Sequence, residues 1–433
     1  MPLESLLGEE ADILTERDFQ AMLVANLLAP LGIPLVSPLL NALTGAFGVS
    51  SARVGLLISA YTAPPIFLIP VAGVLADRYG RKPLLLGGLL LFGVAGTSIA
   101  FTTDFRVAVA LRLLQGVAFA GLTPMIITSL GDLYAGAREA TAQGLRFTTS
   151  GIYQSVFPAI AGVLVGVGWQ YPFLLYALAF PAAAVVYRWF DEPLDAAGPD
   201  ADADPEAAAD GGEGAGSQLR ALVRLALRRR VLALVVGRML PMIAWVGFLT
   251  YNSFLVIQSI GGSAAQSGLL VTINSVMLAV GGSQAGRITS RFDSRLWPLV
   301  AANVGLGGGL ALIGLAPSLP VAAFGTVLLG TGFGVSLSLY RSLITGLAPA
   351  SLRGSLVSLA ESGGRVGSTI TPLGMGAVVT LLAAGAGEVA AVRLTTAVVG
   401  AFVLVGGQVC LVVARLSPRT PAERERRGER GAA

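Results

Sequence analysis

The residues most able to do chemistry in this chain are a few charged side chains inside long apolar stretches. Glu361 and Arg365 lie four residues apart in one stretch, and Arg112 interrupts another. A charge in an apolar solvent is costly unless it is paired, so these positions indicate function or a structural ion pair. One interpretation is a salt bridge between Glu361 and Arg365 within a single helix. In the other, Glu361 binds and releases a proton, since it is the only acidic residue clearly inside a stretch.

Several kinds of active site are excluded by residue types that the sequence lacks. It has no histidine, and Cys410 is its only cysteine. A histidine zinc site, a Ser-His-Asp triad and a thiolate metal cluster are therefore impossible. The sequence also lacks a Gly-x-x-x-x-Gly-Lys-Ser/Thr phosphate-binding loop. One buried acid cannot supply the catalytic cluster of a membrane-embedded enzyme, so we expect no enzyme activity, no metal and no cofactor.

The composition indicates a membrane protein. Of 433 residues, 54% are hydrophobic and 12% charged, and the mean hydropathy is +0.75. Soluble proteins carry about 25% charged residues, so a soluble enzyme, a disordered protein and a nucleic-acid binder are excluded. Apolar runs long enough to span a bilayer predict an all-α membrane protein with about twelve transmembrane helices. They fall near 19–41, 52–76, 83–102, 105–134, 140–168, 170–190, 231–258, 266–287, 297–316, 319–346, 354–384 and 389–415.

The polar segments divide the chain. We expect an N-terminal tail, a six-helix half, a linker, a second half and a basic tail, at 1–18, 19–190, 191–230, 231–415 and 416–433. The linker begins with an acidic, Ala/Gly-rich stretch typical of disorder. It ends with Arg220, Arg224 and Arg228, whose spacing indicates either a helix on the membrane surface or a solvated helix face.

The distribution of arginine predicts the orientation. If both termini are cytoplasmic, the inner loops and tails hold most of the basic residues, and the outer loops hold Arg53, Arg106 and Arg393. Inner loops of membrane proteins carry this excess of positive charge. We therefore expect a multi-pass protein of the plasma membrane with both termini in the cytoplasm.

The two halves repeat each other weakly. The segment GVLADRYGRK at Gly73 has a degraded copy, GRITSRFDSR, 213 residues later at Gly286. Two further pairs, beginning at Gln115 and Leu329 and at Ala137 and Leu352, follow at nearly the same offset. Matches in this order predict two pseudo-symmetric six-helix bundles.

One loop carries the most specific motif of the chain. Between the second and third runs stand Gly73, Leu75, Ala76, Asp77, Arg78, Gly80, Arg81, Lys82 and Leu85. With this motif the chain resembles the major facilitator superfamily over essentially its whole length. The resemblance implies a conformational latch made of Gly73, Asp77, Arg78, Gly80, Arg81 and Asp132. It also implies that Gly73 allows close helix approach, that Asp77 caps the N-terminus of the eleventh helix near Gly354, and that Arg81 pairs with Asp132.

Two more motifs extend the resemblance. Arg112 is followed by Gln115 and Gly116, and in similar families this arginine is linked to proton transfer. The alternative is a structural arginine that bonds backbone carbonyls of the first helix. On the fifth helix, Gly144 fits the start of the glycine pattern of drug exporters, but the pattern ends in Phe157-Pro158-Ala159-Ile160-Ala161-Gly162. The bulky phenylalanine in place of glycine weakens the inference of antiport.

Polar side chains within the runs are candidates for the lining of a substrate cavity. For each of them an ordinary hydrogen bond between helices is the simpler interpretation. They are Asn26, Thr123, Arg146, Tyr153, Gln154, Tyr251, Asn252, Asn274 and Tyr340. Arg238 and Arg341 lie nearer the ends of their helices than Glu361 does.

The resemblance is greatest to the drug/metabolite:proton antiporter group, which implies proton-coupled efflux of a small molecule by alternating access. Five arginines in or near the membrane against one glutamate favour a neutral or anionic substrate. An uptake permease for a sugar or organic anion is one alternative, and a transporter-derived membrane sensor is another. The expected partners are the substrate, protons and the lipid bilayer; we expect a monomer that does not bind nucleic acid.

Overall fold

The computed structural model describes residues 8–192, 220–292, 294, 296–418 and 420–421. Within these residues every regular element is a helix, and eleven helices are long and apolar enough to cross a membrane. The prediction of an all-helical membrane protein is therefore confirmed. Most of the predicted acidic linker, most of the basic tail, and Arg295 lie outside the described residues.

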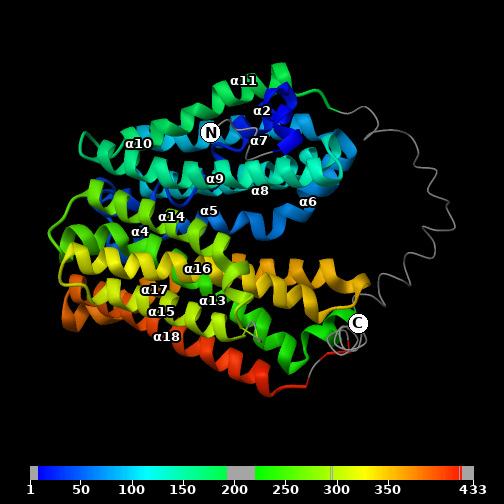
Figure 1. Ribbon diagram of the computed structural model, residues 1–433. Coiled ribbons are helices and arrows are strands. Elements are labelled where there is room, and N and C mark those ends of the chain that lie inside the picture. The colour runs from blue at the N-terminus through cyan, green and yellow to red at the C-terminus, as the bar shows by residue number, and fades with distance from the viewer. Residues whose placement is uncertain (1–7, 193–219, 293, 295, 419, 422–433) are drawn as a thin grey trace. The chain divides into compact units, whose positions relative to one another are not determined.

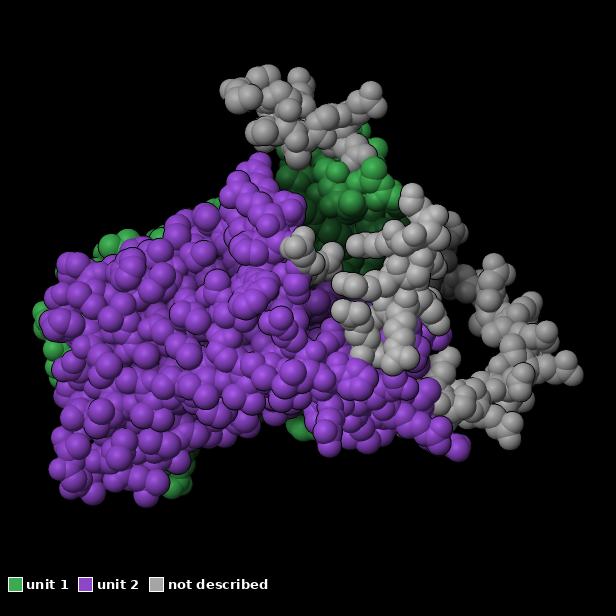
Figure 2. Space-filling model, turned by 60° about the horizontal axis from the view of Figure 1, so that its bottom comes forward, with its two compact units in different colours: residues 1–198, 249–272 green, residues 199–248, 273–433 purple. Residues whose placement is uncertain are grey.

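The chain folds as two compact units, coloured green and purple in Figure 2. Unit 1 comprises residues 1–198 and 249–272, and unit 2 comprises residues 199–248 and 273–433. Unit 1 contains η1 (Gly8–Thr15), α2 (Arg17–Ala25), η2 (Ala29–Leu31), η3 (Ser37–Leu39), α3 (Leu40–Phe47), α4 (Ser51–Val54), α5 (Leu56–Thr62), α6 (Pro64–Tyr79), α7 (Arg81–Ser98), η4 (Ile99–Phe101), α8 (Phe105–Leu133), α9 (Gly136–Val165), α10 (Tyr171–Leu174), η5 (Leu175–Leu178) and α11 (Ala179–Trp189).

Unit 1 also contains η7 (Leu255–Ser259), and unit 2 contains the remaining helices. They are most of α13 (Arg229–Phe254), most of α14 (Ala264–Thr289), α15 (Leu296–Leu315), α16 (Leu319–Leu347), η8 (Ala350–Leu352), α17 (Arg353–Ala386) and α18 (Glu388–Leu416). Within this unit α15 packs against both α16 and α18 (Figure 1). Residues 220–226 are also helical, and Leu225 packs into the apolar core of the unit. The arginine-rich segment before α13 is therefore anchored to unit 2 by its apolar side.

The first apolar run, 19–41, is not one continuous helix. Between α2 and α3 the chain forms turns and the short 3-10 helices η2 and η3. Pro30, Pro34 and Pro38 recur through this segment. Proline lacks a backbone N–H and crowds the preceding turn, so an α-helix does not continue through three of them. For this reason, run 19–41 is the one predicted span that is not among the eleven continuous helices of the described residues.

The end of α13 and the start of α14 pack within unit 1. Ser37 Oγ donates a hydrogen bond of 2.7 Å to the carbonyl of Leu249. A side-chain Cβ added at Gly268 would lie 2.3 Å from the carbonyl oxygen of Pro158, and one added at Gly162 would lie 2.5 Å from that of Ala264. Only residues without a Cβ let the backbones of α9 and α14 approach this closely.

Helix α8 is the central helix of unit 1, in contact with α5, α6 and α7. Its Gly116 faces the backbone of α5, where an added Cβ would lie 2.3 Å from the carbonyl oxygen of Tyr61. Gly121, five residues further along the same helix, has no atom within 4 Å of the corresponding position. Gly116 is therefore closely packed against α5, whereas Gly121 on the same helix has open space around it.

This difference predicts opposite effects of the same substitution. Gly116→Ala should lower the free energy of unfolding by about 1–3 kcal/mol, because α8 must move away from α5. Gly121→Ala should leave it unchanged or raise it by about 0.5–1 kcal/mol, because alanine favours a helix over glycine. Thermal unfolding of the purified variants in one detergent measures both. Equal stability of the two variants would contradict the close contact at Gly116.

Candidate functional site

The side chain of Arg112 lies in the interior of unit 1 and is only 1% exposed. Its Nε donates to the carbonyl of Leu57 at 3.0 Å, its Nη1 to Gln115 Oε1 at 2.6 Å, and its Nη2 to the carbonyl of Gly32 at 2.6 Å. The guanidinium also lies 4.5 Å from the centre of the Tyr61 ring. These contacts compensate the charge with carbonyl dipoles and an aromatic face.

The surroundings of Arg112 are those of a structural arginine that joins three segments. Gly32 belongs to the broken first segment, Leu57 to α5 and Arg112 itself to α8. A Cβ at Gly32 would lie 1.9 Å from the Tyr61 ring, so this glycine makes room for the stacked ring. The contacts therefore match the structural interpretation of the Arg112 motif, and proton transfer there stays a prediction.

The loop motif brings together charges from three parts of unit 1. Arg81 forms an ion pair with Asp132 at the end of α8, and its backbone N–H donates to the carboxylate of Glu192. Gly80 has a φ of 86°, and an added Cβ there would lie 2.6 Å from Glu192 Oε2. Glycine is therefore needed both for the backbone conformation and for access of this carboxylate.

The other members of the predicted latch are more open. Asp77 and Arg78 are exposed at the end of α6, and Arg78 lies 5.4 Å from the centre of the Tyr79 ring. A Cβ at Gly73 would meet no atom within 4 Å. The expectation that Gly73 allows close helix approach therefore stays a prediction. Helix α17 begins at Arg353, one residue from the predicted Gly354.

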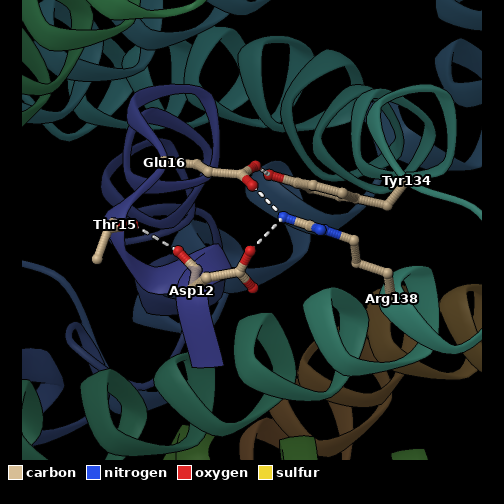
Figure 3. Close-up of polar contacts among 5 residues, drawn as sticks. All are labelled: Asp12, Thr15, Glu16, Tyr134 and Arg138. Atoms are coloured by element: carbon tan, nitrogen blue, oxygen red, sulfur yellow. Dashed lines mark hydrogen bonds and ion pairs between the residues drawn. The ribbon is translucent and has the colours of Figure 1, made fainter. Parts of the chain in front are cut away.

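A network at the start of the chain was not predicted from the sequence (Figure 3). Arg138 on α9 pairs with Glu16 and, at 3.2 Å, with Asp12 of η1, while Tyr134 Oη donates to Glu16 Oε2 at 2.6 Å. Burial and the hydrogen bond to this carboxylate raise the pKa of Tyr134, so the phenol remains a donor at neutral pH. Ile13 of η1 is fully buried. The acidic start of the chain is therefore fastened to the segment between α8 and α9.

In unit 2, a buried arginine pairs with a partly exposed carboxylate. Arg238 on α13 is 2% exposed, and its Nη2 lies 3.1 Å from both oxygens of Glu361 on α17. The Glu361 side chain is 41% exposed. Among the described residues, the buried Nη1 of Arg238 has no hydrogen-bond partner. This pair thus combines a carboxylate open to exchange with a buried cation that has donor capacity to spare.

Two polar pairs lie in the same unit. Asn303 Nδ2 donates to Tyr340 Oη at 3.2 Å, and Trp245 Nε1 donates to Asn274 Oδ1 at 3.1 Å. Tyr340 and Asn274 are fully buried. Tyr340 and Asn274 therefore each accept a hydrogen bond from a neighbouring helix.

The remaining cavity candidates lie in unit 1. Asn26 Nδ2 donates to Ser150 Oγ at 2.7 Å and to the carbonyl of Arg146 at 3.1 Å, which joins α2 to α9. Asn252 Nδ2 donates to the backbone and hydroxyl oxygens of Ser267, both at 2.9 Å. The other candidates in this unit are the half-buried Thr123, Tyr153 and Gln154 and the buried Tyr251.

The motif and the fold agree with a family model described as Major Facilitator Superfamily. It matches residues 22–372, with a second match over 242–433. The chain belongs to the Major Facilitator Superfamily. The resemblance inferred from the Asp77 loop is thus confirmed, and the twelve-span, multi-pass assignment follows the family fold.

Relatives of this superfamily member include exporters. It is 35% identical over 156 residues to the bacillibactin exporter of Bacillus subtilis (strain 168), a match covering 34% of this chain and 38% of that protein. It is 30% identical over 146 residues to the quinolone resistance protein NorA of Staphylococcus aureus, covering 33% of this chain and 37% of that protein. The chain spans about two fifths of the length of the curated relatives it matches.

Solved structures of the superfamily share the fold. The inward-facing, occupied crystal structure of a bacterial homologue of the human lysosomal transporter Spinster has a TM-score of 0.73 at 15% identity. That match covers 92% of this chain and 96% of the other. The D-xylose–proton symporter has a TM-score of 0.69 at 14% identity, covering 94% and 98%.

Sequence reasoning missed the partner of Glu361 and the network around Arg138. Arg238 and Glu361 are 123 residues apart, so no spacing rule relates them. The only available signal was that each is a charged residue of opposite sign within an apolar run. The acids of η1 resembled a solvated tail, and only the neighbouring buried Ile13 and Phe19 could have suggested a packed segment.

The network in Figure 3 predicts that Arg138→Gln loosens the start of the chain. Trypsin should then cleave after Arg17 about 2–5-fold faster, because the segment loses the ion pairs that join it to α9. Mass spectrometry of the truncated product measures the rate. Arg106→Gln removes an exposed arginine elsewhere and should leave it unchanged. If Arg138→Gln leaves the rate unchanged too, the segment is held by Ile13 and Phe19 alone.

Proposed function

We propose that the protein is a secondary transporter that moves a small molecule across the plasma membrane by alternating access, coupled to protons. Membership of the superfamily supports transport, and the matched exporters support efflux of a drug or metabolite. Both chain termini lie in the cytoplasm in this proposal, as the distribution of arginine predicts. The substrate is neutral or anionic, in keeping with the excess of buried arginine over buried acid.

The observation that carries proton coupling is the contact between Arg238 and Glu361. Protonation of the 41% exposed carboxylate removes its charge and weakens the two contacts to Arg238 Nη2. The guanidinium is then left buried without its counter-ion, which is unfavourable. A conformational change, or an anionic group of the substrate at the free Nη1, relieves that cost. Proton binding and substrate binding are thereby linked through one arginine.

An uptake permease for an organic anion is the second candidate. The unpartnered donor of Arg238 favours it, because a carboxylate or phosphate would satisfy this atom. The two candidates differ in the direction of pH-driven flux, which a liposome assay with imposed gradients of either sign measures directly. A protein that binds substrate but carries none would instead be a sensor.

The coupling proposal predicts the behaviour of Glu361→Gln. Accumulation driven by a pH gradient should be lost, whereas counterflow of labelled substrate should continue, because exchange needs no net proton movement. Reconstituted protein in liposomes measures both activities. Glu388→Gln, which alters an exposed carboxylate at the start of α18, is the matched control and should retain both activities.

A folding defect must be separated from a coupling defect, because Glu361→Gln leaves the buried guanidinium of Arg238 without its counter-ion, which is destabilising. The double variant Arg238→Gln/Glu361→Gln removes both members of this pair, and it should be more stable to heat than Glu361→Gln alone without recovering pH-driven flux. A stable Glu361→Gln variant with wild-type pH-driven flux would falsify the coupling role.

The loop latch predicts a conformational effect of Asp77→Asn. The superfamily resemblance implies that this carboxylate stabilises the outward-facing state through a helix dipole, by about 1–2 kcal/mol. The ratio of outward- to inward-facing protein should therefore fall about 5–30-fold. Thiol labelling of single cysteines at each face, in a Cys410→Ser background, measures the ratio. Asp104→Asn keeps an equally good helix cap and should have no effect; an equal shift in both variants would remove Asp77 from the latch.

A further inference from the structure

A groove follows the surface of unit 2 where α14, α15 and α16 meet. Its volume is about 700 Å³, within the range of small-molecule sites. Its lining is apolar apart from Thr331 and the indole nitrogen of Trp297, and includes Ala301, Leu328 and Val335. Phe292 and Trp297, where α14 has ended and α15 begins, are 48% and 54% exposed. The groove is thus an apolar channel that opens at one end of three membrane helices.

The groove is long enough along α15 to hold part of a hydrocarbon chain. Its lining on α15 extends from Trp297 to Gly305, which is about 12 Å along a helix axis. Gly305 and Gly332, which are among the lining residues, let α15 and α16 pack closely. A Cβ added at Gly332 would lie 2.5 Å from the carbonyl oxygen of Ala302, and one added at Gly305 would lie 3.3 Å from that of Leu328. A flexible chain of methylene groups is the ligand that fills such a lining without leaving polar atoms unpaired.

Positive charge gathers at the end of the groove near Trp297. Arg287 and Arg291 lie four residues apart at the end of α14, and both are exposed. Arg415, near the end of α18, lies 5.5 Å from the centre of the Trp297 ring. Tryptophan is enriched at the boundary between bilayer and water, so these guanidinium groups lie at the level of lipid headgroups. Guanidinium groups bind phosphate oxygens with charge-assisted hydrogen bonds.

We propose that this groove binds an anionic glycerophospholipid. One acyl chain lies along Ala301 and Leu328, and the phosphate and headgroup contact Arg287, Arg291 and Arg415. The net negative charge distinguishes this lipid from a zwitterionic one, since the phosphate of the latter is already balanced within its own headgroup. The site is separate from the Arg238–Glu361 pair, neither member of which lines the groove. Lipid binding here would stabilise the packing of α14 on α15 and α16.

The headgroup contact is tested with the full-length protein in detergent. Native mass spectrometry with dioleoyl phosphatidylglycerol and dioleoyl phosphatidylcholine compares two lipids with identical acyl chains. The wild type should retain phosphatidylglycerol at least about 10-fold better. Arg287→Gln/Arg291→Gln should weaken that retention about 5–30-fold, whereas Arg53→Gln/Arg106→Gln removes the same charge from other exposed positions and should change it less than about twofold.

The acyl-chain contact is tested independently. Ala301→Trp fills the groove at an exposed position and should reduce retention of both lipids, while Ala401→Trp, at an exposed position of α18, should not. For the wild type, dihexanoyl phosphatidylglycerol should bind far more weakly than the dioleoyl form, a comparison that needs no variant. Equal retention of both headgroups by the wild type, or equal losses in the Arg287/Arg291 and Arg53/Arg106 variants, would overturn the proposal. So would equal retention of the short- and long-chain lipids.

Discussion

A guanidinium group buried among apolar helices has to find its partners inside the protein, and each unit is organised around one. Arg112 in unit 1 holds the broken first segment, α5 and Gln115 of its own helix through three hydrogen bonds. Arg238 in unit 2 holds α13 to α17 through Glu361. Leaving either charge unpaired would cost several kcal/mol, so the helices that supply partners are fixed in register with the arginine.

Glycine and proline then determine which helices approach these charges. Gly32 leaves space for the Tyr61 ring that stacks on Arg112, and Gly116 lets α8 contact the α5 backbone one turn further on. In the first segment the N–H of Val36 donates to the carbonyl of Ile33, and the carbonyl of Gly32 accepts from Arg112. At the Asp77 end of unit 1, Gly80 allows Glu192 to reach Arg81, which also pairs with Asp132. Two residues beyond Asp132, Tyr134 continues the polar contacts to Glu16.

The sequence predicts the features that depend on residues close together in the chain. The apolar runs specify helices, and the spacing from Gly73 to Leu85 specifies the family and the pairing partner of Arg81. Contacts between distant segments escape such patterns: Glu361 bonds Arg238, which is 123 residues away in the sequence, because helix packing brings α13 alongside α17.

The two buried arginines differ in how completely their hydrogen-bonding groups are paired. All three guanidinium nitrogens of Arg112 donate hydrogen bonds, and their acceptors are two backbone carbonyls and the side-chain oxygen of Gln115. None of these acceptors is a carboxylate that could take up a proton. Arg238 is as deeply buried, but it has an unused Nη1 and a counter-ion that water can reach. A site that is incompletely satisfied can exchange a proton or accept a ligand at small cost, whereas a complete one resists both. The proposed proton coupling is therefore better supported at the Arg238–Glu361 pair than at the Arg112 motif.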